Sequence, residues 1–548
     1  MSSKYQTPIG SFTRKSTFFW ASVGATVGLA NLWQFPYLAS QHGGGLFILI
    51  YLACLLLVTL PLMVTEAALG RHARHGMVLA MDGFVKSAGC HPLWRLTGPL
   101  SVLAAFLVLS FTAVFGGIVL AYVFFGATDR FGASTEASAT ALLADFVSNP
   151  GQHRAFMAWH ALFLVLVLAV SARGVVKGLE RSLRLAVPLA LVMMLGLFAL
   201  AVRHGQLAAG VDKILALRPD DVSLESLRAA FFHAFYTLGL GMGVWAIFGA
   251  YTTAHTRLKR SVLAVVLMDT LVAIIAGLMM FSVAVDNASL EGVRGFSLLF
   301  VSLPTTLAQW PASQMLIAAV FLAVVLIVWA TAISLLEPVV AWFREWTGAP
   351  RGWSVVVVGS AVWLIGLGSL FSFNVWSDER WIGATLFRWL ELITGGVLIP
   401  LVAILLATFT GWCMTRRLSA MVLGPAPALF RKTWYWVMRL VLPVVVTWIG
   451  LQYTVTSLAN LCNNGSDALW CAPATERPGL PPEPELIAEP PQETLPGPES
   501  ITPAEPAATP EPQAPAQKPQ RARGAGETPV DSPVENAPDG DEILYHSL

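Results

Sequence analysis

Charged side chains are scarce in this chain of 548 residues, where Asp, Glu, Lys and Arg together account for 12%. A soluble protein of this size carries about 25% charged residues, so the composition excludes a multidomain cytosolic enzyme. Cysteine is also rare, and five cysteines in so long a chain do not form a disulfide framework. The sequence has no glycine-rich phosphate loop, HExxH motif or Cys/His metal-binding spacing. We expect neither enzymatic activity nor a nucleic-acid partner.

Long apolar runs dominate what is present, with 55% hydrophobic residues and a mean hydropathy of +0.65. A helix needs about 20 apolar residues to cross a bilayer, and backbone groups in lipid must satisfy one another, which favours helices. Eleven stretches meet this requirement: residues 16–39, 44–69, 98–127, 156–172, 183–203, 229–251, 261–285, 312–343, 353–373, 383–410 and 434–458. The sequence therefore predicts an all-α integral membrane protein with eleven transmembrane helices, surrounded by lipid.

Composition divides the chain into three parts. Residues 1–15 are polar and run directly into the first span, so we expect no cleavable signal peptide. Residues 16–458 form the predicted transmembrane domain. The C-terminal part, 459–548, contains most of the prolines: from residue 463 onward there are 18 of the 34, with 15 Asp or Glu against 4 Lys or Arg. Because it has few apolar residues, we expect a disordered, acidic tail.

The distribution of Lys and Arg favours a cytoplasmic N-terminus by the positive-inside rule. We expect a multi-pass protein of a bacterial inner membrane, in which an odd number of spans places the tail in the periplasm. Cys462 and Cys471 would then lie in an oxidising compartment. They would form a disulfide or remain two free thiols.

Two of the spans are poor candidates for continuous helices. The first contains GATVGLANLWQFPY at residues 24–37 and the sixth contains YTLGLGMG at residues 236–243. Clustered glycines and a proline disfavour helix, although close packing through small residues is an alternative explanation. Placement favours the first explanation, because each segment begins a group of five spans, about 16–203 and about 229–410. Paired interruptions in inverted repeats indicate a transport site near the midplane.

Five segments carry a recognisable pattern in a fixed order. They are VGLANLWQFPYLASQHGGGLFILIYL at 27–52, PLMVTEAALGR at 61–71, FFHAFYTLGLGMG at 231–243, GFSLLFVSLP at 295–304 and ATAISLLEP at 330–338. They closely resemble the signature of the neurotransmitter:sodium symporter family. The resemblance implies the 5+5 inverted-repeat fold of the bacterial leucine transporter, with helices 1 and 6 unwound and with helix 11 outside the repeats. It also implies sodium-coupled uptake of an amino acid or a related solute.

The resemblance further implies two sodium sites built from oxygen ligands. The first matches the Thr26 carbonyl and the side chains of Asn31, Thr237 and Asp269. The second matches the carbonyls of Gly24, Val27 and Ile327 and the hydroxyl of Thr331. Sodium is thus the expected coupling ion, and no other metal is expected.

Two sodium-site positions depart from the family pattern. Asp269 is a carboxylate inside an apolar span, which is costly unless it has a partner. It is either a hydrogen-bonded structural acid or the source of a negative charge near sodium. In the second case no chloride is required, and proton antiport is a further alternative. Ala330 stands where the family has a second hydroxyl, so we expect a weaker second site and leave two-sodium coupling open.

The substrate pocket that the resemblance implies would hold a carboxylate-bearing ligand. Its predicted residues are Thr26, Leu29, Ala30, Val108, Thr112, Tyr236, Thr237, Gly239, Met242, Thr331 and Leu335. The amides of Leu29 and Ala30 would bind the carboxylate. Relatives that bind monoamines carry an aspartate where this chain has Gly28, so here the ligand itself is expected to supply the negative charge. Thr112 replaces the usual tyrosine and leaves room for a bulkier or a differently charged solute.

The positions that match the family's gates also differ from its pattern. Gln34 replaces the outer-gate arginine opposite Glu391, and we expect Arg388, one turn earlier, to neutralise Glu391, with His233 as a possible further member. At the inner gate the resemblance assigns Glu345 as the acid and Tyr251 as its supporting tyrosine. Glu66 is expected to accept hydrogen bonds from the unwound backbone of helices 1 and 6, with proton handling as the alternative.

Together these features predict a sodium-driven symporter of an amino acid or amino-acid-like solute. The alternatives are a proton-coupled or sodium-independent relative, suggested by Ala330 and Asp269, and a non-transporting solute sensor that uses the tail to signal.

Overall fold

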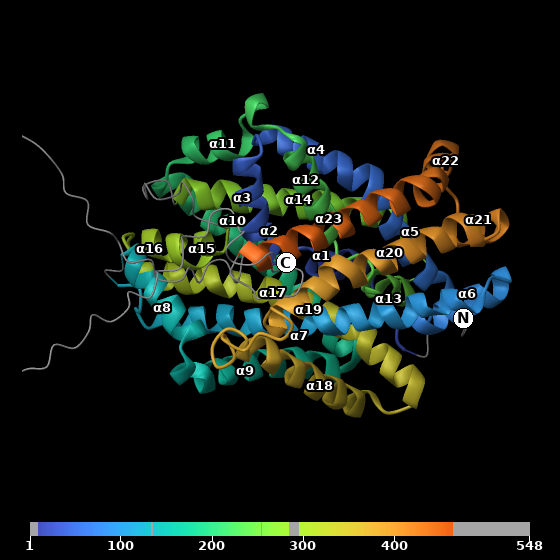
Figure 1. The fold of residues 1–548 in the computed structure, drawn as a ribbon, viewed down its shortest axis with the longest axis horizontal. Helices are drawn as coiled ribbons and strands as arrows, with labels where there is room; N and C mark the ends of the chain where they lie inside the picture. The colour runs from blue at the N-terminus through green and yellow to red at the C-terminus, as the bar shows by residue number, and fades with distance from the viewer. Residues whose placement is uncertain (1–8, 133–134, 254, 284–294, 464–548) are drawn as a thin grey trace, which may run out of the picture. The chain divides into compact units, whose positions relative to one another are not determined.

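The computed structural model describes residues 9–132, 135–253, 255–283 and 295–463. Within these ranges the chain is helical (Figure 1), apart from two isolated bridges that join Gly44 to Leu217 and Trp381 to Ala384. The first α-helices are α1 (Lys15–Thr26), α2 (Leu29–Leu32), α3 (Gln34–Gln41), α4 (Gly45–Cys54), α5 (Leu60–Ala73), α6 (Met77–Ala88), α7 (Thr97–Ala127), α8 (Glu136–Ser148), α9 (His153–Ala172), α10 (Arg181–His204) and α11 (Leu207–Leu215). The remaining α-helices are α12 (Leu224–Tyr236), α13 (Val244–Tyr251), α14 (Leu258–Val283), α15 (Gly295–Ser297), α16 (Leu303–Leu307), α17 (Ser313–Thr347), α18 (Arg351–Phe371), α19 (Leu386–Glu391), α20 (Ile399–Thr408), α21 (Arg416–Leu423), α22 (Ala428–Trp436) and α23 (Leu442–Asn463).

Several long helices contain a turn of π-helix. These turns are η2 (Leu55–Thr59), η5 (Val175–Glu180), η9 (Leu298–Ser302), η10 (Leu392–Leu398), η11 (Phe409–Cys413) and η12 (Val437–Val441). Short 3-10 turns occur at η3 (Pro92–Leu96), η4 (Pro150–Gln152) and η6 (Pro219–Asp221). Figure 1 shows α6, α21 and α22 at one end of the bundle and α8, α15 and α16 at the other.

Nine helices in the described part of the chain are long and apolar enough to cross a membrane. They are residues 45–73, 92–127, 150–172, 175–204, 258–283, 313–347, 351–371, 386–413 and 428–459. The first and sixth predicted spans are not among the nine, because each is broken into shorter helices. The total of eleven spans therefore stays a prediction. The predicted tail lies outside the described residues from 464 onward, as does Cys471, so a Cys462–Cys471 disulfide stays a prediction as well.

The first span breaks between α1 and α2. Val27 and Gly28 leave the helical conformation, and Gly28 is extended at φ −128° and ψ −169°. The Asn31 side chain accepts a hydrogen bond from the Gly28 amide at 3.0 Å, which caps the short helix that follows. The predicted interruption of this span is confirmed.

The sixth span breaks between α12 and α13, and glycine explains how. Gly239, Gly241 and Gly243 have φ of 62°, 73° and 70°, values that side-chain-bearing residues rarely adopt. The Trp245 indole donates to the Leu238 carbonyl at 2.7 Å and holds the unwound segment in place. Three glycines at alternate positions therefore convert a would-be helix into an irregular segment, as predicted.

Helix α13 packs unusually close to α5 through two reciprocal glycines. A Cβ built on Gly70 would lie 1.8 Å from the Ala246 carbonyl oxygen, and one built on Gly249 would lie 2.0 Å from the Ala67 carbonyl oxygen. Small residues at such positions let membrane helices approach closely. This contact holds one side of the broken sixth span against a continuous helix.

We expect Gly70→Val to prevent folding, because the new Cβ would clash with backbone that cannot move aside. The destabilisation should therefore exceed the roughly 1–3 kcal/mol that is typical of overpacking. Gly83→Val is the matched control, since a Cβ at Gly83 meets nothing within 4 Å. Size-exclusion chromatography and thermal unfolding in detergent would compare the two variants. A monodisperse Gly70→Val protein with unchanged unfolding temperature would contradict this packing.

Candidate functional site

Residues predicted for the first sodium site lie close together near the two breaks. Asn31 Oδ1 accepts from the Thr237 hydroxyl at 3.2 Å, which joins the first span to the sixth. The side chains of Asn31 and Thr26 lie within interaction range of the Asp269 carboxylate. Both Asn31 and Asp269 are completely buried. The structure thus places an amide oxygen, a hydroxyl and a carboxylate around one point.

Hydrogen bonds satisfy the Asp269 carboxylate only in part. Its Oδ2 accepts from the Tyr51 hydroxyl at 3.3 Å, whereas its buried Oδ1 has no hydrogen-bond donor among the described residues. An unpaired buried carboxylate is costly inside a membrane. A sodium ion would supply the missing positive partner, so the residues present fit the ion.

The oxygens expected for a second sodium site gather around the Thr331 hydroxyl on α17. Its Oγ1 lies 3.1 Å from the Gly24 carbonyl, 3.2 Å from that of Val27 and 3.3 Å from that of Ile327. These are the four predicted oxygens of this site. Ala330, which is fully buried, brings only a methyl group, and a Cβ on Gly24 would lie 3.0 Å from it. The site therefore has four protein oxygens at the predicted positions, and no fifth comes from Ala330.

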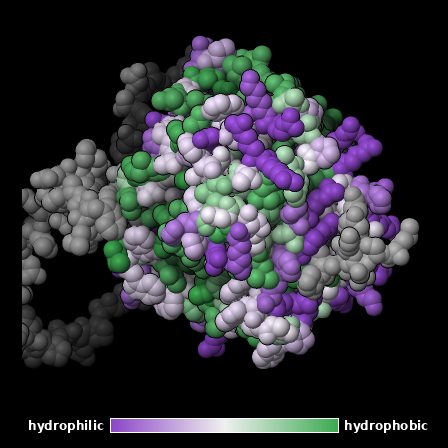
Figure 2. Space-filling model, turned by 90° about the vertical axis from the view of Figure 1, so that its right-hand side faces the viewer, coloured by the Kyte–Doolittle hydropathy of each residue, from purple (hydrophilic) through white to green (hydrophobic). Residues whose placement is uncertain are grey.

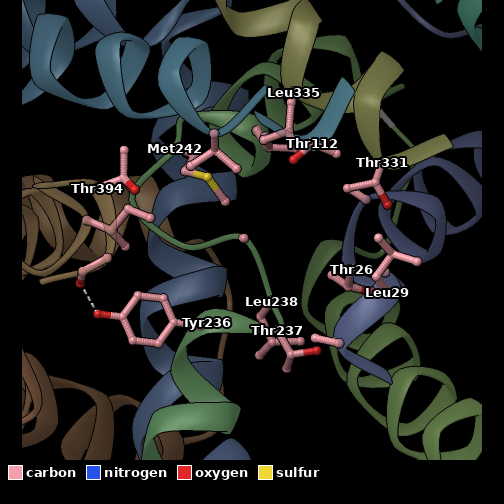
Figure 3. Close-up of a pocket in the computed structure, with 18 of the residues that line it drawn as sticks. Thr26, Leu29, Thr112, Tyr236, Thr237, Leu238, Met242, Thr331, Leu335 and Thr394 are labelled. Atoms are coloured by element: carbon pink, nitrogen blue, oxygen red, sulfur yellow. Dashed lines mark hydrogen bonds between the residues drawn. The ribbon is translucent and has the colours of Figure 1, made fainter. Parts of the chain in front are cut away.

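A pocket opens between the two breaks (Figure 3). All eleven predicted substrate residues line it, contributed by α1, α2, α7, α12, α17 and the unwound part of the sixth span. In Figure 3, Thr26, Leu29 and Thr331 face Met242 and Thr394 across the open centre, with Thr112 and Leu335 on a third side. Most of the lining is apolar, and Glu391 is the one acid among the described residues that line it.

Further pocket residues were missed by sequence reasoning. They include Phe111, Phe232, Thr394, Gly395 and Tyr453. The Tyr236 hydroxyl donates to the Gly395 carbonyl, a contact drawn as the dashed line in Figure 3. The signal that could have found this wall is the TGG run at 394–396, because adjacent glycines inside a span indicate irregular helix. Here the span forms the π-helical turn η10.

The outer end of the pocket is bounded by a buried acid with two partners. Glu391 Oε2 lies 2.9 Å from Arg388 Nη1, and its Oε1 accepts from the Tyr453 hydroxyl at 3.2 Å. The expected neutralisation by Arg388 agrees with this geometry. His233 contacts the predicted gate group through Gln34, whose Oε1 lies 3.3 Å from His233 Nδ1, and its ring packs against Phe35 and Tyr51. No hydrogen bond among the described residues joins His233 to Glu391.

A second cavity lies beyond this acid and shares two aromatic residues with the pocket. Phe232 and Tyr453 line both cavities, and their rings stack with centroids 5.1 Å apart. Gln34, Glu225 and Arg228 line the second cavity. A thin layer of stacked rings thus separates the pocket from a more polar chamber.

At the predicted inner gate, one contact differs from the prediction. Glu345 Oε1 lies 3.0 Å from His75 Nδ1 and accepts from the Gly76 amide at 3.1 Å. The Tyr251 hydroxyl donates instead to Glu337 Oε1 at 2.6 Å. Tyr251 therefore does not support Glu345 in this structure. The Tyr251 hydroxyl cannot contact both acids, because Glu337 and Glu345 are eight positions apart on α17, which corresponds to about 12 Å along a helix.

Glu337 forms a buried ion pair that the sequence did not predict. Its Oε2 lies 2.6 Å from Arg351 Nη2, with Glu337 fully buried. Arg351 also donates to the Ser171 carbonyl at 2.6 Å and to its hydroxyl at 3.0 Å. Tyr251, Glu337, Arg351 and Ser171 thus connect α13 to α17, α18 and α9.

Glu66 contacts the unwound sixth span as expected. Its Oε2 accepts from the Gly241 amide at 3.3 Å, and it is almost completely buried. No described hydrogen bond joins it to the first span. A different acid, Glu180, holds the start of α1 by accepting from the Thr13 amide at 2.7 Å and the Thr17 hydroxyl at 2.7 Å.

Known proteins similar to this chain are transporters. The sequence profile of the sodium:neurotransmitter symporter family matches residues 10–135 and 138–460. An uncharacterized sodium-dependent transporter of Bacillus subtilis, YhdH, is 31% identical over 80% of this chain and 96% of its own length. One from Haemophilus influenzae is 24% identical over 79% of this chain and 96% of its own. The crystal structure of MhsT in complex with L-phenylalanine superposes with a TM-score of 0.72 at 29% identity, over 81% of this chain and 99% of that one.

Proposed function

This chain belongs to the sodium:neurotransmitter symporter family and is a sodium-coupled, multi-pass membrane transporter, and from that premise we propose that it imports an amino acid or amino-acid-like solute without requiring chloride. The observation that carries the proposal is the meeting of two helix breaks at one pocket whose wall contains the oxygens of Asn31 and Thr237. Solute and sodium would therefore bind side by side, so that each stabilises the other.

The substrate class follows from the charges of the pocket. Its acid, Glu391, is neutralised by Arg388, and Gly28 offers no carboxylate for a substrate amine. A ligand that brings its own carboxylate would contact the amides of Leu29 and Ala30 at the first turn of α2 and the sodium beside them. The apolar lining and the small Thr112 suit a large apolar side chain. MhsT, the similar protein above, was solved with L-phenylalanine.

Chloride independence rests on Asp269. Its carboxylate would place a fixed negative charge beside the first sodium, the charge that an anion would otherwise bring. We further propose a bacterial inner membrane location with a cytoplasmic N-terminus, residues 1–15, and a periplasmic tail, residues 459–548. Gln34 and Glu391 would form the outer gate and Glu345 the inner gate, and Glu66 would have a structural role.

Uptake into proteoliposomes tests the proposal. A pooled set of labelled amino acids and amine or betaine analogues would be offered with an inward sodium gradient, with sodium and chloride, or with a proton gradient alone. We expect accumulation with sodium gluconate equal to that with sodium chloride. Uptake driven by protons in the absence of sodium would favour a proton-coupled relative, and solute binding without counterflow would favour a sensor.

We expect Ala330→Ser to strengthen sodium binding. A serine hydroxyl would add the fifth oxygen beside Thr331, and one such ligand contributes on the order of 1 kcal/mol, about fivefold in affinity. The measurement is the sodium concentration for half-maximal uptake, expected to fall about fivefold. Ala332→Ser, an equally buried change on another face of α17, is the control. Equal half-saturation in Ala330→Ser and the unmodified protein would argue against the second site.

A further inference from the structure

A groove between α21 and α22 lies outside the transport pathway. It is lined by Arg416, Ser419, Ala420 and Leu423 from α21 and by Ala428, Arg431, Lys432, Trp434, Tyr435 and Trp436 from α22. The two helices lie at the same end of the bundle, at the right of Figure 1. Figure 2 views that end, where hydrophilic side chains gather. Of the lining residues, Leu423 and Trp434 are buried, whereas Arg416, Arg431 and Lys432 are exposed.

The groove has a strong positive charge with no acid to balance it. Between Glu391 and Asp467 the sequence contains five cations, Arg416, Arg417, Arg431, Lys432 and Arg439, and no Asp or Glu. The first four are exposed. None of the five forms an ion pair within the described part of the chain. The charge that complements this groove must therefore come from outside the described chain.

Aromatic rings hold some of these cationic side chains in place. The Arg439 guanidinium lies 3.9 Å from the centre of the Trp412 ring, and it donates to the Tyr435 hydroxyl. Arg416 lies 5.5 Å from the centre of the Tyr435 ring on the groove side. Lys259 holds the connecting loop by donating to the Pro425 carbonyl at 2.6 Å. Stacked guanidiniums lose less freedom when they bind a phosphate.

An apolar, exposed surface continues from the groove along the same helical span. Leu440, Val444, Leu451 and Val455 are 48%, 69%, 62% and 53% exposed. Their spacing from Lys432 and Trp436 places all six residues on one side of a helix. Residues 428–459 form one of the nine candidate spans. Trp412 and Trp436, about half exposed, stand between the cations and this surface, as tryptophans do at a membrane interface.

We propose that this groove binds the phosphate headgroup of an anionic phospholipid, with its acyl chains along α23. Arg416, Arg431 and Lys432 contact the phosphate, and Tyr435 and Trp436 pack beside the glycerol. Basic pockets between membrane helices suit such headgroups. The apolar surface distinguishes a lipid from free phosphate, which would need only the cations. The site adjoins the span that carries Glu391 and Thr394, yet its occupancy does not depend on the proposed solute.

Native mass spectrometry of the full chain in detergent would count retained phosphatidylglycerol. We expect the triple variant Arg416→Gln, Arg431→Gln, Lys432→Gln to bind it at least about tenfold more weakly, since each cation contributes on the order of 1 kcal/mol. The matched control is Arg173→Gln, Lys177→Gln, Arg181→Gln, three exposed cations that run from the end of α9 to the first residue of α10. Arg416→Lys with Arg431→Lys keeps the charge and should retain the lipid if the triple variant does not fold.

Three results would overturn the proposal. The first is equal phosphatidylglycerol retention by the groove variant and the control. The second is inorganic phosphate displacing the lipid at similar concentration, which would show an anion site without lipid selectivity. The third is equal retention of zwitterionic phosphatidylcholine, which would show general lipid adhesion.

Discussion

Asp269→Asn should raise the sodium concentration for half-maximal uptake by at least about 30-fold. The substitution keeps the size of the side chain and removes its charge. A unit charge about 4 Å from a cation contributes about 4 kcal/mol at an effective dielectric constant of 20, and part of this offsets the cost of burying the carboxylate. A net loss of about 2 kcal/mol corresponds to the expected 30-fold change.

Chloride provides the second readout of this variant. If the carboxylate supplies the negative charge beside sodium, adding chloride should partly restore uptake in Asp269→Asn and change nothing in the unmodified protein. Tyr51→Phe is the matched control, because it removes the donor 3.3 Å from Asp269 and keeps the charge. Unchanged sodium half-saturation in Asp269→Asn, or unmodified uptake that stops in gluconate, would refute the assigned role.

Arg351→Gln should lower the free energy of unfolding by about 3–5 kcal/mol, the usual cost of leaving one partner of a buried ion pair alone. Glu337 would lose the guanidinium 2.6 Å away and retain only the Tyr251 hydroxyl as a described donor. Thermal unfolding in detergent measures the effect as a large fall in midpoint temperature.

The double variant Glu337→Gln, Arg351→Gln separates charge from packing. With both charges removed, two amides of similar shape can hydrogen-bond to each other, so much of the lost stability should return. Additive losses in the double variant would show that the pair contributes only through independent contacts, contrary to our account. Arg228→Gln, which disrupts an exposed pair with Glu225 at 3.2 Å, should change stability by less than about 1 kcal/mol.

The fold could be predicted in the places where local chemistry decides it. Gly239, Gly241 and Gly243 adopt left-handed backbone without the penalty that a side chain would bring, so the break of the sixth span was visible in the sequence. In the first span, the Asn31 side chain accepts from the Gly28 amide and favours a new helix start at that point. Apart from η10, where the adjacent glycines at 395–396 are a signal, the π-helical turns were not predictable, because they depend on how neighbouring spans pack.

The contacts of the site could be predicted where a sequence motif fixes the position of backbone atoms. They were harder to predict where a long side chain has several alternative partners. Thr331 meets the carbonyls of Gly24 and Val27 because the break exposes them. By contrast, Tyr251 contacts Glu337, and His233 contacts Gln34. The sequence alone leaves more than one partner open for each of these side chains, and only the packed helices decide which one it can contact.

Simultaneous flux of solute and sodium tests the central claim most directly. Proteoliposomes would receive the solute identified in the uptake screen with ²²Na⁺, and both isotopes would be counted in the same vesicles. We predict sodium entry that requires the solute, solute entry that requires sodium, and loss of both in Asn31→Ala. Solute accumulation at an unchanged rate with potassium in place of sodium, and without ²²Na⁺ entry, would contradict the account.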